Sequence, residues 1–319
     1  MVVKIILFSI LTNVMVAEMV QYGGEIFKDG QDARNAGMGG YSISIAGGRN
    51  PAMLIHTKES SVHFSNKEKF GGLARVTSVS YVHYGKNDKI QSPIHVSIIN
   101  RSVENISDTR TAWFDDGNST PELGEINYFN IKEITQNEFG VKIAFFRRYN
   151  SFVLGTCLKP TYTSLADYSA WGISGDIAAL VQLFEKKMDI TLRIEDIIGV
   201  NKWSTGKNET IVPLIIGGGQ FQFHSLLLGF EIGSEIMGNT LLNYNAGFEF
   251  HQEDEIVIFR GGISHNQLFS AGIGLNFNMV QFDYAYLHPY DRNPFEPTQI
   301  ISVGIILEKF DWIKGKITP

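Results

Sequence analysis

The chain has 319 residues, a formal net charge of -6 and a mean hydropathy of -0.03. This acidic balance offers no basic surface for nucleic acid, and a single cysteine, Cys157, excludes an intramolecular disulfide. The 32 glycines and the 12% of aromatic residues are both high for a soluble domain, in which glycine is usually about 7%.

The first 17 residues predict a secretory signal peptide. Lys4 gives a short basic start, Ile5 to Val16 is mostly apolar, and Ala17 is a plausible cleavage point. The alternative is a membrane anchor, but an apolar run this short cannot span about 30 Å of hydrocarbon. No other segment approaches the roughly 20 uninterrupted apolar residues of a spanning helix. We therefore expect export, to the outer membrane of a Gram-negative-type bacterium.

A glycine-rich run, Gly37 to Gly40, follows the predicted signal peptide. A phosphate-binding loop would need a Lys-Ser/Thr pair after it and a buried strand before it, and the sequence has neither. We therefore do not expect a nucleotide site here.

From about Leu226 to Leu307 the chain alternates, residue by residue, between apolar and polar side chains. In one stretch Leu226, Leu228 and Phe230 share a side, opposite Gly229 and Glu231. A period of two indicates strands whose faces meet different surroundings. Glycines and carboxylates on the polar side favour a lumen inside and lipid outside. We predict an all-β fold, a closed antiparallel transmembrane barrel of about fourteen strands between residues 60 and 310. The expected strands are Ser60–Asn66, Leu73–Tyr84, Pro93–Asn100, Phe139–Arg148, Ser151–Thr163, Ala170–Leu183, Ile190–Glu195, Thr210–Phe223, Leu226–Ile236, Leu241–Phe250, Ile256–Ser264, Phe269–Phe277, Gln281–Tyr286 and Gln299–Leu307.

The connections between these strands support a membrane barrel. Every second one is tight, as at 148–150 and 278–280, whereas the intervening ones include the long segments 101–138, 196–209 and 287–298. Short turns on one rim and long loops on the other are typical of outer-membrane barrels.

Six charged residues fall on the polar side of the predicted strands. They are Lys159, Glu231, Glu235, Glu249, Arg260 and Asp283. Charges in a narrow barrel must be paired or hydrated, so an ion-pair network with a structural role is expected. The alternative is that this network lines a conduit or holds a segment inside the barrel.

The sequence gives no sign of catalysis, cofactor or metal. The acidic loop 115–125 has oxygens suited to calcium but lacks the regular spacing of an EF-hand. The histidines have no metal-ligand spacing such as HExxH, and no GxSxG nucleophile motif is present. Cys157 lies in a predicted strand, where a packed, inert thiol is expected. We predict that the protein is not an enzyme.

The segment DARNAGMGGYSISIAGGRNPAML, Asp32 to Leu54, resembles the start of mature PorV/PorQ proteins, which belong with the FadL-like outer-membrane barrels. The first half of the family motif is matched by Ala33, Arg34, Gly37, Met38, Gly39 and Gly40, and the second by Asn50, Pro51, Ala52 and Leu54. Further similar stretches are 104–110, 274–275, 283–286 and 302–304. The chain departs from the pattern at 47–49, where the family has an acidic pair and a Trp. It also continues beyond Phe310 with a short extension, 311–319.

The resemblance implies that residues 18–59 form a plug segment inside the barrel. It further implies accessory service in type IX protein secretion, with a translocon or an exported cargo protein as partner. The alternatives are FadL-like transport of hydrophobic small molecules, with such a molecule as ligand, and a structural or adhesive surface barrel. Outer-membrane lipid is an expected partner in each case.

Overall fold

The protein is described from a computed structural model. The described residues are 18–20, 24–42, 49–84, 93–120, 122–236, 242–253, 256–289 and 296–310. The predicted signal peptide and the extension 311–319 lie outside these ranges. Among the described residues, no helix is both long enough and apolar enough to cross a lipid bilayer.

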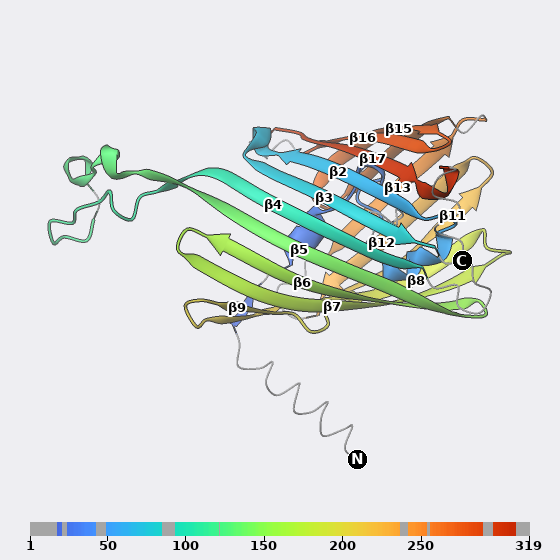
Figure 1. Ribbon diagram of the computed structural model, residues 1–319, viewed down its shortest axis with the longest axis horizontal. Coiled ribbons are helices and arrows are strands. Elements are labelled where there is room, and N and C mark those ends of the chain that lie inside the picture. The colour runs from blue at the N-terminus through green and yellow to red at the C-terminus, as the bar shows by residue number, and fades with distance from the viewer. Residues whose placement is uncertain are drawn as a thin grey trace, which may run out of the picture.

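Fourteen antiparallel strands form a closed transmembrane barrel (Figure 1). Consecutive strands pair with each other, and the barrel closes where β17 pairs with β2. The prediction of a fourteen-stranded barrel is therefore confirmed. The barrel strands are β2 (Ser61–Lys69), β3 (Ala74–His83), β4 (Ile94–Asp108), β5 (Lys132–Tyr149), β6 (Phe152–Leu165), β7 (Tyr168–Leu183), β8 (Met188–Glu195), β11 (Leu214–Phe223), β12 (Leu226–Glu235), β13 (Asn243–His251), β14 (Val257–Ser264), β15 (Gln267–Phe277), β16 (Val280–His288) and β17 (Thr298–Ile306).

Three short strands lie outside this set. β9 (Val200–Trp203) and β10 (Asn208–Ile211) form a hairpin between β8 and β11, and β9 also pairs with β7. β1 (Glu18–Val20) pairs in parallel with β10. The remaining short helices are η2 (Phe70–Gly72), η3 (Leu123–Glu125), η4 (Tyr128–Asn130) and η5 (Leu307–Lys309).

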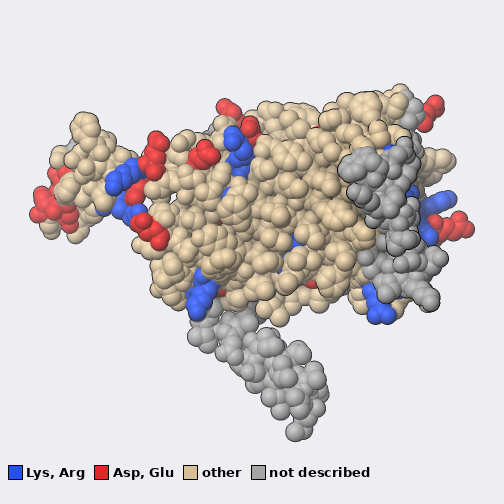
Figure 2. Space-filling model, in the orientation of Figure 1, with Lys and Arg blue, Asp and Glu red and all other residues tan. Residues whose placement is uncertain are grey.

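Alternating side chains place charge inside the barrel and apolar groups outside. On β12, Leu228 and Phe230 are 45% and 50% exposed, whereas Glu231 is 2% exposed. On β13, Phe248 is 43% exposed beside Glu249 at 0%. A soluble protein buries its apolar residues and leaves charges in water, so this inverted pattern is that of a wall facing lipid. Figure 2 shows the same distribution: the visible charges gather mainly toward the two ends of the barrel.

A segment from the N-terminal part of the chain lies inside the barrel, and we call it the inner segment (residues 24–42 and 49–57). It contains α2 (Glu25–Asp29), α3 (Ala33–Gly37) and the 3-10 helix η1 (Pro51–His56). α3 packs against β15, β16 and β17, and η1 packs against β5, β6 and β7. Both helices begin with a side-chain cap: Asp32 accepts from the Asn35 N–H, and Asn50 accepts from the Ala52 N–H.

Two of the predicted boundaries were wrong. β4 and β5 continue past the predicted ends at Asn100 and Phe139, so the loop expected over 101–138 is confined to 109–131. The stretch 104–108, which falls within the long loop predicted over 101–138, is therefore strand. Beyond the barrel wall, β4 and β5 pair only with each other, from Ile106↔Ile134 to Asp108↔Lys132. It has no lipid-facing side, and the two-residue alternation that marks the other strands is lost there.

The expected strand Thr210–Phe223 is divided into β10 and β11. Pro213 lies at the division and has no N–H to give to a neighbouring strand. A proline in a predicted central strand is a signal that could have placed this break.

Candidate functional site

The inside of the barrel is the candidate site, because the inner segment meets the predicted lumen charges there. Glu249 of β13 is the centre of the first cluster. Arg34 donates to both of its oxygens, at 2.8 Å and 2.6 Å, and Arg260 of β14 donates to Oε2 at 2.6 Å. Arg260 also donates to Asp283 of β16 at 2.7 Å. One motif residue and three predicted lumen residues therefore form a single chain of ion pairs.

A second cluster holds the later part of the inner segment. Arg49 pairs with Glu195 of β8 at 2.5 Å, and Glu195 accepts from Arg193 at 2.9 Å. Arg193, fully buried, also pairs with the predicted lumen residue Glu231 of β12. Arg193 was not among the predicted lumen residues, although it lies on the inward-facing side of the predicted strand Ile190–Glu195, and the alternation of that strand could have identified it.

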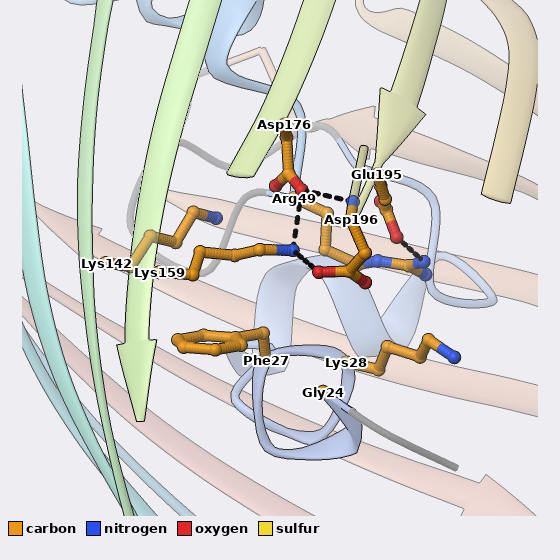
Figure 3. Close-up of a pocket in the computed structure, with 9 residues that line it drawn as sticks. All are labelled: Gly24, Phe27, Lys28, Arg49, Lys142, Lys159, Asp176, Glu195 and Asp196. Atoms are coloured by element: carbon orange, nitrogen blue, oxygen red, sulfur yellow. Dashed lines mark hydrogen bonds and ion pairs between the residues drawn. The ribbon is translucent and has the colours of Figure 1, made fainter. Parts of the chain in front are cut away.

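Lys159 of β6 is the centre of a third cluster (Figure 3). Its Nζ lies 2.6 Å from Asp176 of β7 and 2.7 Å from Asp196, the residue that follows β8. The ring of Phe27, from α2, lies 5.3 Å from the same ammonium. Figure 3 shows these side chains converging from the wall and from the inner segment. The sequence predicted Lys159 but neither of its acidic partners.

A fourth cluster surrounds Asp29 at the end of α2. Its carboxylate lies 3.3 Å from Lys67 and 2.8 Å from Lys69 of β2, and 3.0 Å from Arg101 of β4. Burial by itself would raise the pKa of Asp29, but the three cations outweigh burial and hold that pKa well below its usual range. A carboxylate held by three cations from two strands fixes α2 to the wall.

The glycines of the motif allow the inner segment to touch the wall through its backbone. Gly39 and Gly40 have backbone φ angles of +71° and +82°, which residues other than glycine rarely adopt. A Cβ placed on Gly262 of β14 or on Gly247 of β13 would meet the backbone of Met38. Gly37 similarly lies against Gly272 of β15. The run 37–40 therefore packs directly onto glycine positions of three strands.

Several side chains of the inner segment bind charged groups of the wall. Asp29, Arg34 and Arg49 form the ion pairs described above, and His56 Nε2 lies 2.7 Å from the Asp189 carboxylate. These contacts come from different sides of the barrel, so the segment is held all round rather than hinged at one edge. The motif residues Asn50 and Pro51 begin η1, between Arg49 and His56.

Two cavities lie on opposite sides of the inner segment. One, of about 470 Å³, is lined by polar residues such as Lys67 and Glu235 and by apolar ones such as Ile216. The other, of about 510 Å³, is lined by Arg34, His56 and Glu249 among others. Among the residues that the structure describes, none lines both cavities. The inner segment therefore divides the lumen, and Glu235 lies in the first cavity rather than in one of the four clusters.

The other candidate groups gain no site from the fold. Asp115, Asp116 and Glu125 have carboxylate oxygens within 4.8 Å of one another, the one such group found in the described part of the chain. These oxygens already accept backbone N–H groups, for example from Gly117 at 2.9 Å. Cys157 is buried, as expected of a packed thiol.

Similar proteins were found by comparison with solved structures. No protein-family model matches the chain, and no curated protein matches it significantly. The toluene transporter TodX of Pseudomonas putida has a TM-score of 0.62 and 10% identity, over 88% of this chain and 99% of that one. The toluene transporter TbuX of Ralstonia pickettii has a TM-score of 0.60 and 11% identity, over 88% and 99%. A FadL homologue of Pseudomonas aeruginosa has a TM-score of 0.51 and 10% identity, over 86% and 97%. At such low identity the likeness shows a shared β-barrel fold.

Proposed function

We propose that this chain is an outer-membrane transport barrel, in which the inner segment acts as a plug and hydrophobic small molecules pass around it. One observation carries the proposal: the inner segment is anchored on several sides, between two cavities of the lumen that share no described lining residue. A plug held in this way prevents an open pore but leaves space on each side for a small ligand. The fold shared with toluene transporters supports the same class of function.

The lining of the first cavity suits a ligand that has both an apolar body and polar groups. Phe70, Leu214, Ile216 and Leu287 contribute apolar side chains to it, and the charged side chains of Asp29, Lys67, Glu231 and Glu235 line it as well. Small-molecule sites commonly combine apolar walls with a few polar groups that orient the ligand.

Uptake by cells tests the proposal. The chain is expressed in a Gram-negative host that lacks its own transporter of this kind, and entry of labelled toluene, a long-chain fatty acid and a disaccharide is timed. We expect faster entry of a hydrophobic compound and no change for the disaccharide. Thr298→Trp adds a bulky ring to the wall of the first cavity and should abolish the gain. Ile301→Trp, on the lipid-facing side of the same strand and 57% exposed, should preserve it.

Equal rates with and without the chain, for every hydrophobic compound, would refute hydrophobic transport. Faster entry of the disaccharide would also contradict it, because that result requires a water-filled pore.

A second proposal is accessory service in type IX secretion, and the resemblance of the inner-segment motif to PorV/PorQ proteins supports it. Arg34, the motif residues 37–40 and the Asn50-Pro51 pair would then serve to hold the plug of a barrel that binds a translocon or exported cargo. Affinity purification of the tagged chain from its own membranes tests this. Recovery with a large barrel translocon supports the proposal, and recovery of the chain alone contradicts it.

A further inference from the structure

The strands β4 and β5 continue beyond the barrel as an isolated two-stranded arm (Figure 1). The last pair on the neighbouring strand β3 is Ala74↔Val103, and the last on β6 is Gln136↔Leu165. Past these points the two strands pair with each other alone, out to Asp108↔Lys132. The arm ends in residues 109–131, which we call the tip.

Hydrogen bonds among its own residues order the tip. The Trp113 Nε1–H donates to Glu125 at 3.0 Å, and the Phe114 N–H donates to the Glu125 carbonyl at 3.0 Å. The Asn127 N–H donates to the Ala112 carbonyl at 2.7 Å. A surface ordered before binding loses less conformational entropy when it binds.

Aromatic side chains stand exposed on this ordered tip. Phe129 is 99% exposed, and Phe114 and Tyr128 are each 61% exposed. Because the arm projects beyond the wall, these rings do not belong to the lipid-facing surface of the barrel strands. Clustered, exposed aromatic residues in a fixed geometry are the usual energetic centre of a protein interface.

The tip is also acidic. Asp115, Asp116, Glu122 and Glu125 lie on it, and Figure 2 shows carboxylates gathered at its end. Its one arginine, Arg110, is already paired with Asp108 at 2.8 Å and with Asp167 at 3.2 Å. Hydrogen bonds from Gly117 and Ser119 keep the pKa of Asp115 below its ordinary value, so its charge persists in mild acid.

We propose that the tip is a docking surface for a second protein that presents a cationic rim around an apolar pocket. The aromatic rings would fill the pocket and the carboxylates would meet Lys or Arg of the rim. This binding is independent of transport and holds whether or not ligands pass through the barrel.

Charge favours this partner over two other possible occupants, a membrane surface and a second copy of this chain. The phosphate groups of a membrane surface are anionic and would repel the tip. A second copy of this chain has exposed cations on the same rim as the arm, but Arg75 lies 3.8 Å from Glu68 and Lys207 lies 3.6 Å from Glu209. Its exposed Arg147, Arg148 and Lys186 lie on the opposite rim. Two copies in one membrane cannot bring opposite rims together.

Three synthetic peptides of equal length test the proposal against the full chain in nanodiscs. The first combines Lys with Leu and Phe, the second combines Lys with Ser, and the third combines Glu with Leu and Phe. Fluorescence anisotropy measures binding at low salt and at about 150 mM salt, where the Debye length is about 8 Å. We expect the first peptide to bind most tightly, with an affinity that falls as salt rises.

Two variants of the tip should each weaken that binding by about tenfold or more. Phe129→Ser removes a ring that supports nothing in the fold. The double variant Asp115→Asn with Asp116→Asn removes charge but keeps the acceptor oxygens that the loop uses. Phe184→Ser is the matched control, since Phe184 is 70% exposed in the turn between β7 and β8, on the opposite rim.

Equal binding of all three peptides, or equal losses from Phe184→Ser and Phe129→Ser, would overturn the proposal. Binding of the tip to phosphatidylglycerol vesicles that depends on Phe129 would also overturn it, in favour of a membrane contact. Because neither tip variant touches the lumen, failure here leaves the uptake result unaffected, and the reverse is also true.

Discussion

Replacing Arg34 by alanine should loosen the inner segment without unfolding the barrel. Arg34 makes two charge-assisted hydrogen bonds to Glu249, at 2.8 Å and 2.6 Å. Breaking a buried ion pair costs about 3–5 kcal/mol when the remaining charge has no other partner. Here Glu249 keeps Arg260 at 2.6 Å and His251 at 2.9 Å. The Arg34 side chain is also 31% exposed, so water can replace part of what is lost. We therefore expect a local cost of about 2 kcal/mol.

Hydrogen exchange measures this cost directly. The Met38 and Gly40 amides both donate to the Asn35 carbonyl and are exposed to exchange only when the segment opens. A cost of about 2 kcal/mol predicts roughly thirtyfold faster exchange of these amides, since every 1.4 kcal/mol is tenfold. Amides of the barrel strands should exchange as before.

Arg110→Ala is the control, because it removes the same charge from a surface pair with Asp108 and Asp167. Surface pairs contribute about 0–1 kcal/mol, so the inner-segment amides should not respond. The reasoning fails if Arg34→Ala leaves their exchange unchanged, or if Arg110→Ala accelerates it equally.

Three other predictions concern the contact of the inner segment with the wall, the ion pairs of Asp29 and the buried thiol of Cys157. Gly262→Ala places a Cβ against the Met38 backbone and should lower the free energy of unfolding by about 1–3 kcal/mol. The control Gly217→Ala, whose Cβ would have nothing within 4 Å, should leave the thermal midpoint unchanged. Equal midpoints for both variants would contradict the close approach of Gly262 to Met38. Because the pKa of Asp29 is depressed in the folded protein, its contribution is present above its ordinary value of 3.8 and is lost as the pH falls below that value. Asp29→Asn should therefore flatten the acid side of a stability–pH profile, and an unaltered slope would argue against the cation cluster. Cys157, 5% exposed, should resist a hydrophilic maleimide in the folded barrel and react in denaturant, and rapid labelling of the native protein would show a more open wall.

The sequence by itself determined the barrel. Lipid outside and a polar lumen inside impose opposite preferences on successive residues. The alternation of apolar and polar side chains can therefore be read from neighbouring residues, as at Leu228, Gly229 and Phe230. The same local pattern placed Glu231, Glu249, Arg260, Asp283 and Lys159 on the inner side. It failed where the two surroundings are absent, in the arm beyond the wall, where the extent of β4 and β5 was underestimated.

Only the tertiary structure decided which inner charge meets which. Arg34 and Glu249 are 215 residues apart in sequence, and Arg49 and Glu195 are 146 apart. Parity gives the face of a strand but not its height or its angle around the barrel, which depend on how all the strands are staggered when the cylinder closes. For that reason the anchoring of the inner segment by Asp29, Arg49 and His56, and the division of the lumen into two cavities, followed from the closed fold alone.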